Sequence, residues 1–208
     1  LGSWRIDVEL RDGVPRIVAA SALARTAAAA LGAAGAPGPA SLGLILAVDA
    51  ELAELNAAHM GKHGPTDVLS FPLLPPSAFP DHPGKDAAAS PEDEPFPLPP
   101  GARSHLGDIV VSVERAIGQA EAGRGGQTGD IRWDARDELR LLVTHGVLHV
   151  CGWDHAEPAE EASMRALERD LLVQALQRAQ GNQTQAAQLL GMNRDQIRYR
   201  LEKFGLDK

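Results

Sequence analysis

The sequence predicts a domain that mixes strands with helices, followed by a small all-helical module. Short alternating or apolar runs typical of strands are interspersed with longer periodic or alanine-rich runs typical of helices, and the charge balance changes near the carboxy terminus. The chain has 208 residues, of which 44% are hydrophobic and 23% charged. It is therefore long enough for one ordinary domain with a small appended module.

The elements expected of the first domain follow in order. We expect strands at residues 5–10, 42–48, 67–71 and 107–112. We expect helices at residues 14–34, 49–60, 113–122 and 134–150. The first helix should end at the glycines and prolines of residues 35–39. Asp49 should cap the second helix, because its short side chain can accept from first-turn amides.

Residues 72–104 are expected to be a proline-rich, acidic insertion. Ten of the 15 prolines lie between Pro72 and Pro100, where Lys85 is the only basic residue among five acidic ones. Proline removes amide donors and like charges repel, so we expect an extended surface loop. A tolerated insertion is favoured over a proline-rich ligand for a partner protein.

Cysteine usage, hydropathy and charge indicate the compartment of the protein and its division into modules. Cys151 is the only cysteine, which excludes an internal disulfide and suits a reducing compartment, so we expect the cytoplasm and no membrane partner. We also expect no secretory signal. The net charge is -8, but residues from Arg165 onward carry +3 and the remainder -11. This asymmetry suggests two modules, the smaller one better suited to a polyanion.

Three of the seven histidines lie in the run THGVLHVCGWDH. His145 and His149 are four residues apart, so a helix places both imidazoles on one face. Gly152 can end that helix in a left-handed conformation and bring His155 toward the pair. Three imidazoles and one open position are typical of catalytic zinc, which lowers the pKa of bound water to near neutral. The sequence therefore predicts one Zn²⁺ per chain at His145, His149 and His155.

The residues next to the histidines argue against a zinc protease and suggest a catalytic carboxylate. Zinc proteases place a glutamate directly after the first histidine as general base, whereas this chain has Gly146. Cys151 should point away from the paired histidines and serve in packing. Asp154 is the candidate catalytic carboxylate, with the metal-bound water as the alternative, although an aspartate in a turn is more often a local cap.

These motifs resemble those of a known family. His145 to His155 matches H-G-x-L-H-x-x-G-x-D-H, and Leu55-Asn56, TDVLSFP from Thr66 and LGDI from Leu106 agree in order. On them, residues 4–165 resemble the YbeY-type endoribonucleases, zinc-dependent proteins of ribosomal RNA maturation and ribosome quality control. The resemblance implies an α+β fold with a small mixed sheet and packed helices, the three zinc ligands above, and RNA of the ribosome or its precursor as substrate.

The same resemblance implies a substrate cleft, for which Asn56, Lys62 and Ser70 are the candidate binding residues. Two positions depart from the family pattern: Met60 stands where an arginine is common, and His63 where an acidic residue is usual. Arginine can bond phosphate bidentately and methionine cannot, so we expect phosphate contact to fall to Lys62, Arg103 or another residue, with weak activity as the alternative. An acidic loop close to the cleft would repel RNA.

Residues 166–208 have the pattern of a helix-turn-helix. Gly181 and Asn182 should end one helix and cap the next, Gly191 should supply a turn, and Asn193 should cap a third helix. The segment from Glu168 to Leu206 resembles the DNA-binding domain of the Fis family. That resemblance implies nucleic-acid binding. The alternative is a small helical module for oligomerisation or packing, with its charged face in solvent.

Side chains of the last helix divide into two faces. Ile197, Leu201 and Phe204 should form the buried face. The candidate nucleic-acid-binding residues are Arg194, Gln196, Tyr199, Arg200 and Lys203.

Our first interpretation is therefore a zinc-dependent, single-strand-specific endoribonuclease with a nucleic-acid-binding module. A zinc-sensing DNA-binding regulator without catalysis is the second interpretation, favoured by Met60 and the negative charge. The third is a zinc hydrolase acting on small molecules or peptides.

Overall fold

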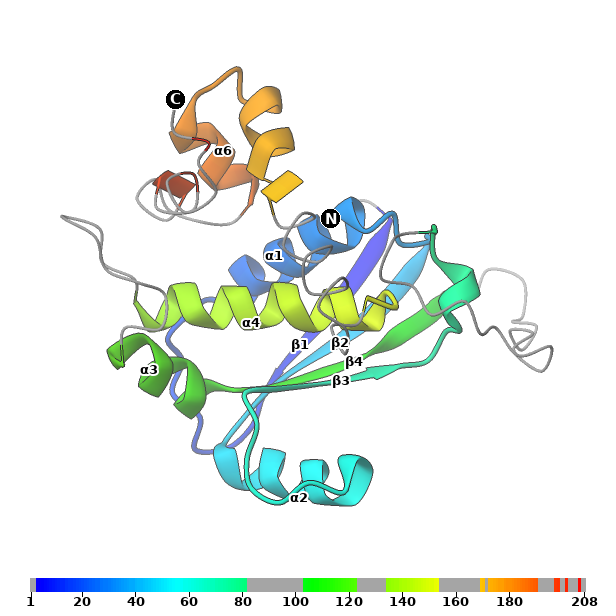
Figure 1. The fold of residues 1–208 in the computed structure, drawn as a ribbon, viewed down its shortest axis with the longest axis vertical. Helices are drawn as coiled ribbons and strands as arrows, with labels where there is room; N and C mark the ends of the chain where they lie inside the picture. Colours follow the sequence, from blue (N-terminus) through cyan, green and yellow to red (C-terminus); the bar gives the residue numbers. More distant parts are fainter. Residues whose placement is uncertain are drawn as a thin grey trace.

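The computed structural model describes residues 3–81, 103–122, 134–153, 169–170, 172–190, 197–198, 201 and 206. The elements run β1 (Trp4–Leu10), α1 (Ala20–Ala33), β2 (Ala40–Ala47), α2 (Asp49–Met60), β3 (Val68–Pro72), η1 (Pro76–Ala78), β4 (Ser104–Ser112), α3 (Val113–Glu121), α4 (Ala135–Val150) and α6 (Gln183–Leu189). Figure 1 shows α1 and α4 on one face of a sheet and α2 on the other. The first domain is thus built in layers around that sheet.

The sheet has the strand order β1-β2-β4-β3. The first three of these strands are parallel, and β3 runs antiparallel to β4. Parallel neighbours need a crossover, which α1 provides between β1 and β2. The predicted α+β fold with a small mixed sheet is confirmed.

β4 begins at Ser104, three residues before the expected start of this strand, and contains a bulge at Gly107. Ser41 pairs with His105 and Gly43 with Asp108, so the pairing register shifts between them. Gly107 has a φ of 148°, which L-residues rarely adopt. The extra residue brings both Leu106 and Ile109 into the core, where each is fully buried.

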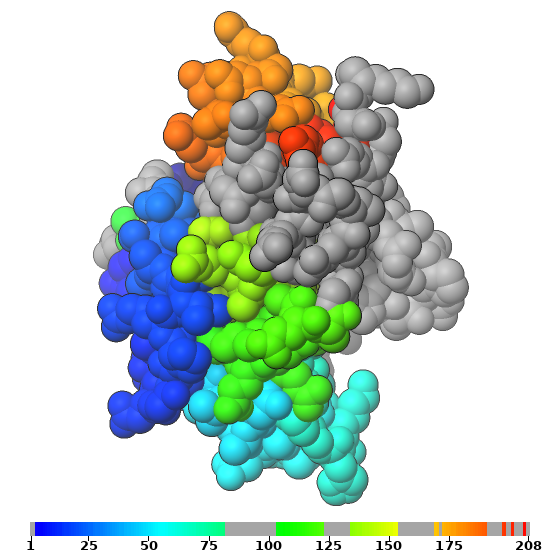
Figure 2. Space-filling view, turned by 90° about the vertical axis from the view of Figure 1, so that its left-hand side faces the viewer, coloured from blue at the N-terminus to red at the C-terminus, as the bar shows by residue number. Residues whose placement is uncertain are grey.

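The core lies between the sheet and the layer formed by α1 and α4. Leu23 and Leu31 of α1 pack with Leu148 of α4 in one apolar cluster with the strands. Figure 2 shows a strip of α4 between α1 and α3, and α4 contacts both helices. Burial of α4 on three sides fixes its orientation over the sheet.

Two helix starts differ from the sequence prediction. α1 begins at Ala20 and not at residue 14, and the segment before it buries Val14 and Val18 without forming a helix. Asp49 does not cap α2, whose N-cap is Val48. The carboxylate of Asp49 instead accepts from Ser112 Oγ at 2.6 Å and Arg115 Nε at 3.0 Å. These tertiary partners outcompete local capping.

The first ten residues of the predicted loop are mostly irregular, but they are not fully extended. Pro72 still belongs to β3, η1 follows at Pro76–Ala78, and Phe79 is 4% exposed. This apolar contact anchors the segment on the domain. Residues 82–102, which hold most of the insertion's prolines and acidic side chains, lie outside the described part of the chain.

The carboxy-terminal module has an apolar cluster of its own, separate from that of the first domain. The cluster consists of Leu172, Ala175, Ala179, Ala186, Ala187, Leu190, Ile197 and Leu201. Asn182 caps α6 as expected, with its side chain accepting from Thr184 N and Gln185 N. In Figure 1 this module lies on the far side of α1 from the sheet. Across the described ranges, no helix has the length and apolar character needed to span a membrane.

The structure describes part of the predicted buried face of the last helix and none of its predicted contact residues. Gly191, Asn193, Phe204 and the candidate residues Arg194, Gln196, Tyr199, Arg200 and Lys203 lie outside the described residues. Ile197 and Leu201, which we expected in the core, are 0% and 1% exposed.

Candidate metal centre and cleft

The paired histidines stand on a helix whose two ends are firmly defined. At the start of α4, Asp134 accepts from Arg136 N and Asp137 N, and the Asp137 carboxylate accepts from Asp134 N in return. At the other end, Gly152 has a φ of 82° and Trp153 N donates to Leu148 O at 3.0 Å. The expected left-handed conformation at Gly152, which ends the helix, is thus confirmed.

His145 and His149 face each other on α4. Their Nε2 atoms are 3.1 Å apart, and the ring centroids are 4.6 Å apart. Two nitrogen ligands of one tetrahedral zinc ion, at bond lengths near 2.05 Å, would lie about 3.3 Å apart. The pair therefore presents two imidazole nitrogens at nearly the separation that a shared ion requires.

The structure describes two of the predicted members of the centre, His145 and His149. Asp154 and His155 lie outside the described residues. Among the residues that are described, no three His, Cys, Asp or Glu side chains are arranged to hold a metal ion. The geometry at hand is thus a pair of histidines on one wall of a cleft.

Gly146 explains how α4 comes close enough to the sheet. A β-carbon at this position would lie 2.6 Å from Ile109 Cγ2 and 3.1 Å from Val68 Cγ2. Ser70 adds a direct link, because its Oγ donates to Gly146 O at 3.0 Å. A side chain between the two histidines would therefore push the helix away from β3 and β4.

A cleft of about 700 Å³ brings the histidine pair together with residues of α2 and β3. The predicted substrate-binding residues Asn56, Lys62 and Ser70 all line it, as does Met60. Thr66, Asp67 and Trp153 also line it and were not predicted, although all three fall inside motifs quoted from the sequence. Met60 is 46% exposed and adds an apolar surface at the rim.

Two other candidates, Arg103 and Cys151, lie elsewhere. Arg103 does not line the described cleft, and its guanidinium donates to Ser3 O at 3.1 Å. Cys151 is 1% exposed within the main core, and burial raises the pKa of its thiol to about 12. A thiol that stays protonated at neutral pH is a poor zinc ligand, so the expected packing role of Cys151 agrees with its position.

Two protein-family models match this chain. The family model "Endoribonuclease YbeY" matches residues 12–176. A second model, "Bacterial regulatory protein, Fis family", matches residues 163–204. A Thermotoga maritima protein known from its solution structure shares 18% identity, with a TM-score of 0.43 over 85% of this chain and 93% of that one.

Curated relatives named "Endoribonuclease YbeY" agree with the first match. The relative from Roseiflexus sp. (strain RS-1) is 39% identical over 65% of this chain and 70% of its own length. That from Salinispora tropica is 46% identical over 62% and 70%. That from Roseiflexus castenholzii is 34% identical over 80% and 90%. Because the family match spans most of the chain and these relatives agree with it, the chain belongs to the YbeY endoribonuclease family.

Proposed function

We propose that this protein is a zinc-dependent endoribonuclease that cleaves single-stranded RNA in ribosomal RNA maturation and ribosome quality control. The observation that carries the proposal is the His145–His149 pair, with Nε2 atoms 3.1 Å apart on the wall of the cleft. Relatives that carry the endoribonuclease name supply the class of substrate.

The donor set fits zinc. Neutral imidazole is a preferred zinc ligand, and the two Nε2 atoms lie 3.1 Å apart in the cleft. We propose His155 as the third ligand, brought near by the turn at Gly152, with Asp154 beside it as an acid–base group. A zinc ion bound there would supply Lewis-acid chemistry to a phosphodiester.

The protein's own side chains would bind and orient the RNA strand. Lys62 supplies a cation for a phosphate, and Met60 supplies apolar surface for a base. Ser70 holds Gly146 and thereby fixes the histidine-bearing helix against β3. A cleft of this volume accommodates roughly one or two nucleotides, whereas an A-form duplex is far wider, which favours an unpaired strand.

Removal of the metal tests the proposal. Prolonged chelation should abolish cleavage of a labelled single-stranded precursor RNA, and stoichiometric Zn²⁺ should restore it, while a fully paired RNA stays intact throughout. The chelated protein should retain its circular dichroism spectrum, because the core does not depend on the cleft. Undiminished cleavage after complete metal removal, verified by elemental analysis, would refute zinc-dependent catalysis.

The carboxy-terminal module is proposed to tether the enzyme to nucleic acid. Its match to the Fis family and the capped α6 favour this role. The same match favours a second candidate function, a zinc-sensing DNA-binding regulator. The two functions differ in whether the histidine cleft cleaves RNA or modulates DNA affinity.

Deletion of residues 167–208 separates the two parts. Because each part has its own apolar cluster, the truncated chain should fold and bind zinc as the full chain does. Its affinity for duplex DNA should fall at least tenfold, and the salt dependence of binding should become shallower as phosphate contacts are lost. Fluorescence anisotropy at two salt concentrations measures both quantities. Equal binding by the two proteins would argue against a DNA-binding role.

A further inference from the structure

We infer that Asn56 is a positioning residue, which holds Lys62 at the cleft rim for contact with a substrate phosphate. The inference rests on the proposed function, because it concerns how the cleft binds RNA. It assigns Asn56 a role different from the direct RNA contact expected from the sequence.

Asn56 lies near the end of α2 and bonds to the segment that follows it. Its side-chain Nδ2 donates to Gly64 O at 2.9 Å. Its backbone oxygen accepts from Gly61 N and, at 3.3 Å, from Lys62 N. The residue lines the cleft but is only 7% exposed, and its Nδ2 is committed to Gly64 O. One asparagine thus binds both flanks of Lys62.

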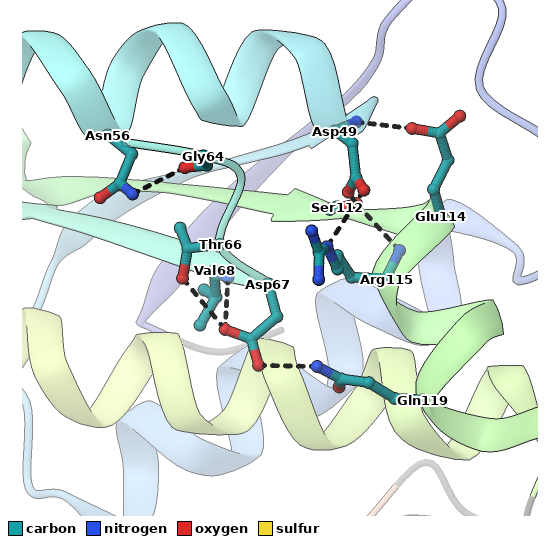
Figure 3. Close-up of polar contacts among 10 residues, drawn as sticks. All are labelled: Asp49, Asn56, Gly64, Thr66, Asp67, Val68, Ser112, Glu114, Arg115 and Gln119. Carbon is teal, nitrogen blue, oxygen red and sulfur yellow. Dashed lines mark hydrogen bonds and ion pairs between the residues drawn. The ribbon is translucent and has the colours of Figure 1, made fainter. Parts of the chain in front are cut away.

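The other end of this segment, residues 61–67 (the rim loop), is held independently. The Asp67 carboxylate accepts from Val68 N at 3.0 Å and from Gln119 Nε2 at 3.1 Å, and Ser112 N donates to Asp67 O at 2.9 Å. Figure 3 shows both attachments, with Asn56 at Gly64 and Gln119 at Asp67. Lys62 therefore lies in a short loop that is fixed at both ends.

The rim loop needs such attachments because its backbone is unusual. Gly61 and Gly64 have φ values of 62° and 92°, in the left-handed region. Glycine visits many other conformations in a free loop, so external hydrogen bonds must select this one. Loss of the Asn56 amide would release Gly64 and let the backbone beside Lys62 reorient.

The rim loop fixes the backbone of Lys62, the basic residue of the cleft. Lys62 is the one Lys or Arg among the described residues that line the cleft. Its side chain is exposed to solvent and forms no hydrogen bond or ion pair with the described residues. A flexible ammonium binds a phosphate best when its backbone is already placed, since less entropy is lost on binding. The asparagine thereby acts on RNA through the lysine.

A double-mutant cycle on the full chain tests this role. The probe is a fluorescein-labelled single-stranded oligouridylate, and binding is measured by anisotropy over a series of salt concentrations, with chelator present so that no cleavage occurs. Lys62→Ala should weaken binding about five- to tenfold and reduce the slope of log K against log salt by about 0.7, the loss of one phosphate contact. Asn56→Leu, which keeps the size of the side chain, should weaken binding nearly as much and reduce the slope likewise.

The decisive variant combines the two substitutions. If Asn56 acts through Lys62, Asn56→Leu has no further effect in the Lys62→Ala background. If Asn56 contacts RNA itself, its loss multiplies with that of Lys62 and leaves the salt slope unchanged, which would overturn the inference. An absence of RNA binding by the wild type would instead refute the proposed substrate class and, with it, this role.

Gln119→Leu provides a second variant from outside the cleft. Gln119 Oε1 is buried without a hydrogen-bond partner in the described residues, so leucine should be tolerated by the fold. Loss of the bond from Gln119 should loosen the Asp67 side chain, although Val68 N and Ser112 N still bind this residue. RNA binding should then weaken two- to threefold, and again only while Lys62 is present. An undiminished Gln119→Leu effect in the Lys62→Ala background would contradict control of Lys62 by the rim loop.

Discussion

Replacement of His149 by alanine is expected to lower the rate of RNA cleavage by at least about 10³-fold, because a bound metal contributes several kcal/mol of transition-state stabilisation. The same substitution removes one of two imidazoles whose nitrogens lie 3.1 Å apart, so zinc affinity should fall by two orders of magnitude or more. His145→Ala should behave alike, and the double variant should be little worse than either single one, since the two residues act as a unit. Equilibrium dialysis and single-turnover cleavage measure the two effects.

His59→Ala is the matched control. This histidine is on α2, contacts Phe71 edge-on at a centroid distance of 5.2 Å, and does not line the cleft. Its loss should leave zinc stoichiometry and cleavage within twofold of the wild type. A His149→Ala protein that retained one tightly bound zinc ion and the wild-type rate would remove the pair from the reaction.

Substitution of Gly107 by alanine is expected to cost the fold about 3–5 kcal/mol, from backbone strain and overpacking together. A β-carbon there would lie 2.3 Å from Phe71 O, a backbone atom of the neighbouring strand that cannot move aside cheaply. The φ of 148° adds strain of its own. Urea denaturation should show a large fall in midpoint with an unchanged m-value.

Gly13→Ala separates the two causes of this loss. Gly13 also has a positive φ, of 80°, but nothing lies within 4 Å of its would-be β-carbon. Its replacement should therefore cost only the left-handed strain, about 1–2 kcal/mol. Equal losses at the two positions would mean that the close approach at the β4 bulge adds nothing.

Much of the fold could be predicted because its local signals are strong. Alternation in β1 matches its alternating burial, and the spacing of His145 and His149 gave their shared helix face. The beginning of β4 was missed because the bulge at Gly107 breaks the alternation: His105 and Asp108, three residues apart, share one face and are hydrogen-bonded at 3.0 Å. Periodicity alone cannot anticipate an inserted residue.

Other features could not be predicted because they depend on hydrogen bonds between residues far apart in the sequence. Asp49 was expected to cap α2, but Ser112 and Arg115, more than sixty residues away, hold its carboxylate. Ser70 and Asn56 line the cleft, and the sequence did not predict that each also donates to a backbone carbonyl, of Gly146 and Gly64. Such bonds follow from the packing of α4 and the path of the rim loop, which a single sequence does not encode in any local pattern.

The glycine between the histidines illustrates how the motif relates to the structure. From the sequence, Gly146 signified the absence of the glutamate that zinc proteases use. In the fold it has a positive role, because only a residue without a side chain lets α4 approach Ile109 and Val68 as it does. The position at which a zinc protease carries its glutamate packs here against Ile109 of β4 and Val68 of β3.

The most direct test of the account is a cleavage time course on labelled ribosomal RNA precursor, wild type beside His149→Ala, with zinc content determined on the same preparations. The account predicts one zinc ion per wild-type chain and cleavage by the wild type alone. A wild type that holds stoichiometric zinc yet leaves the RNA intact, as the variant does, would contradict the nuclease assignment and favour the zinc-sensing regulator.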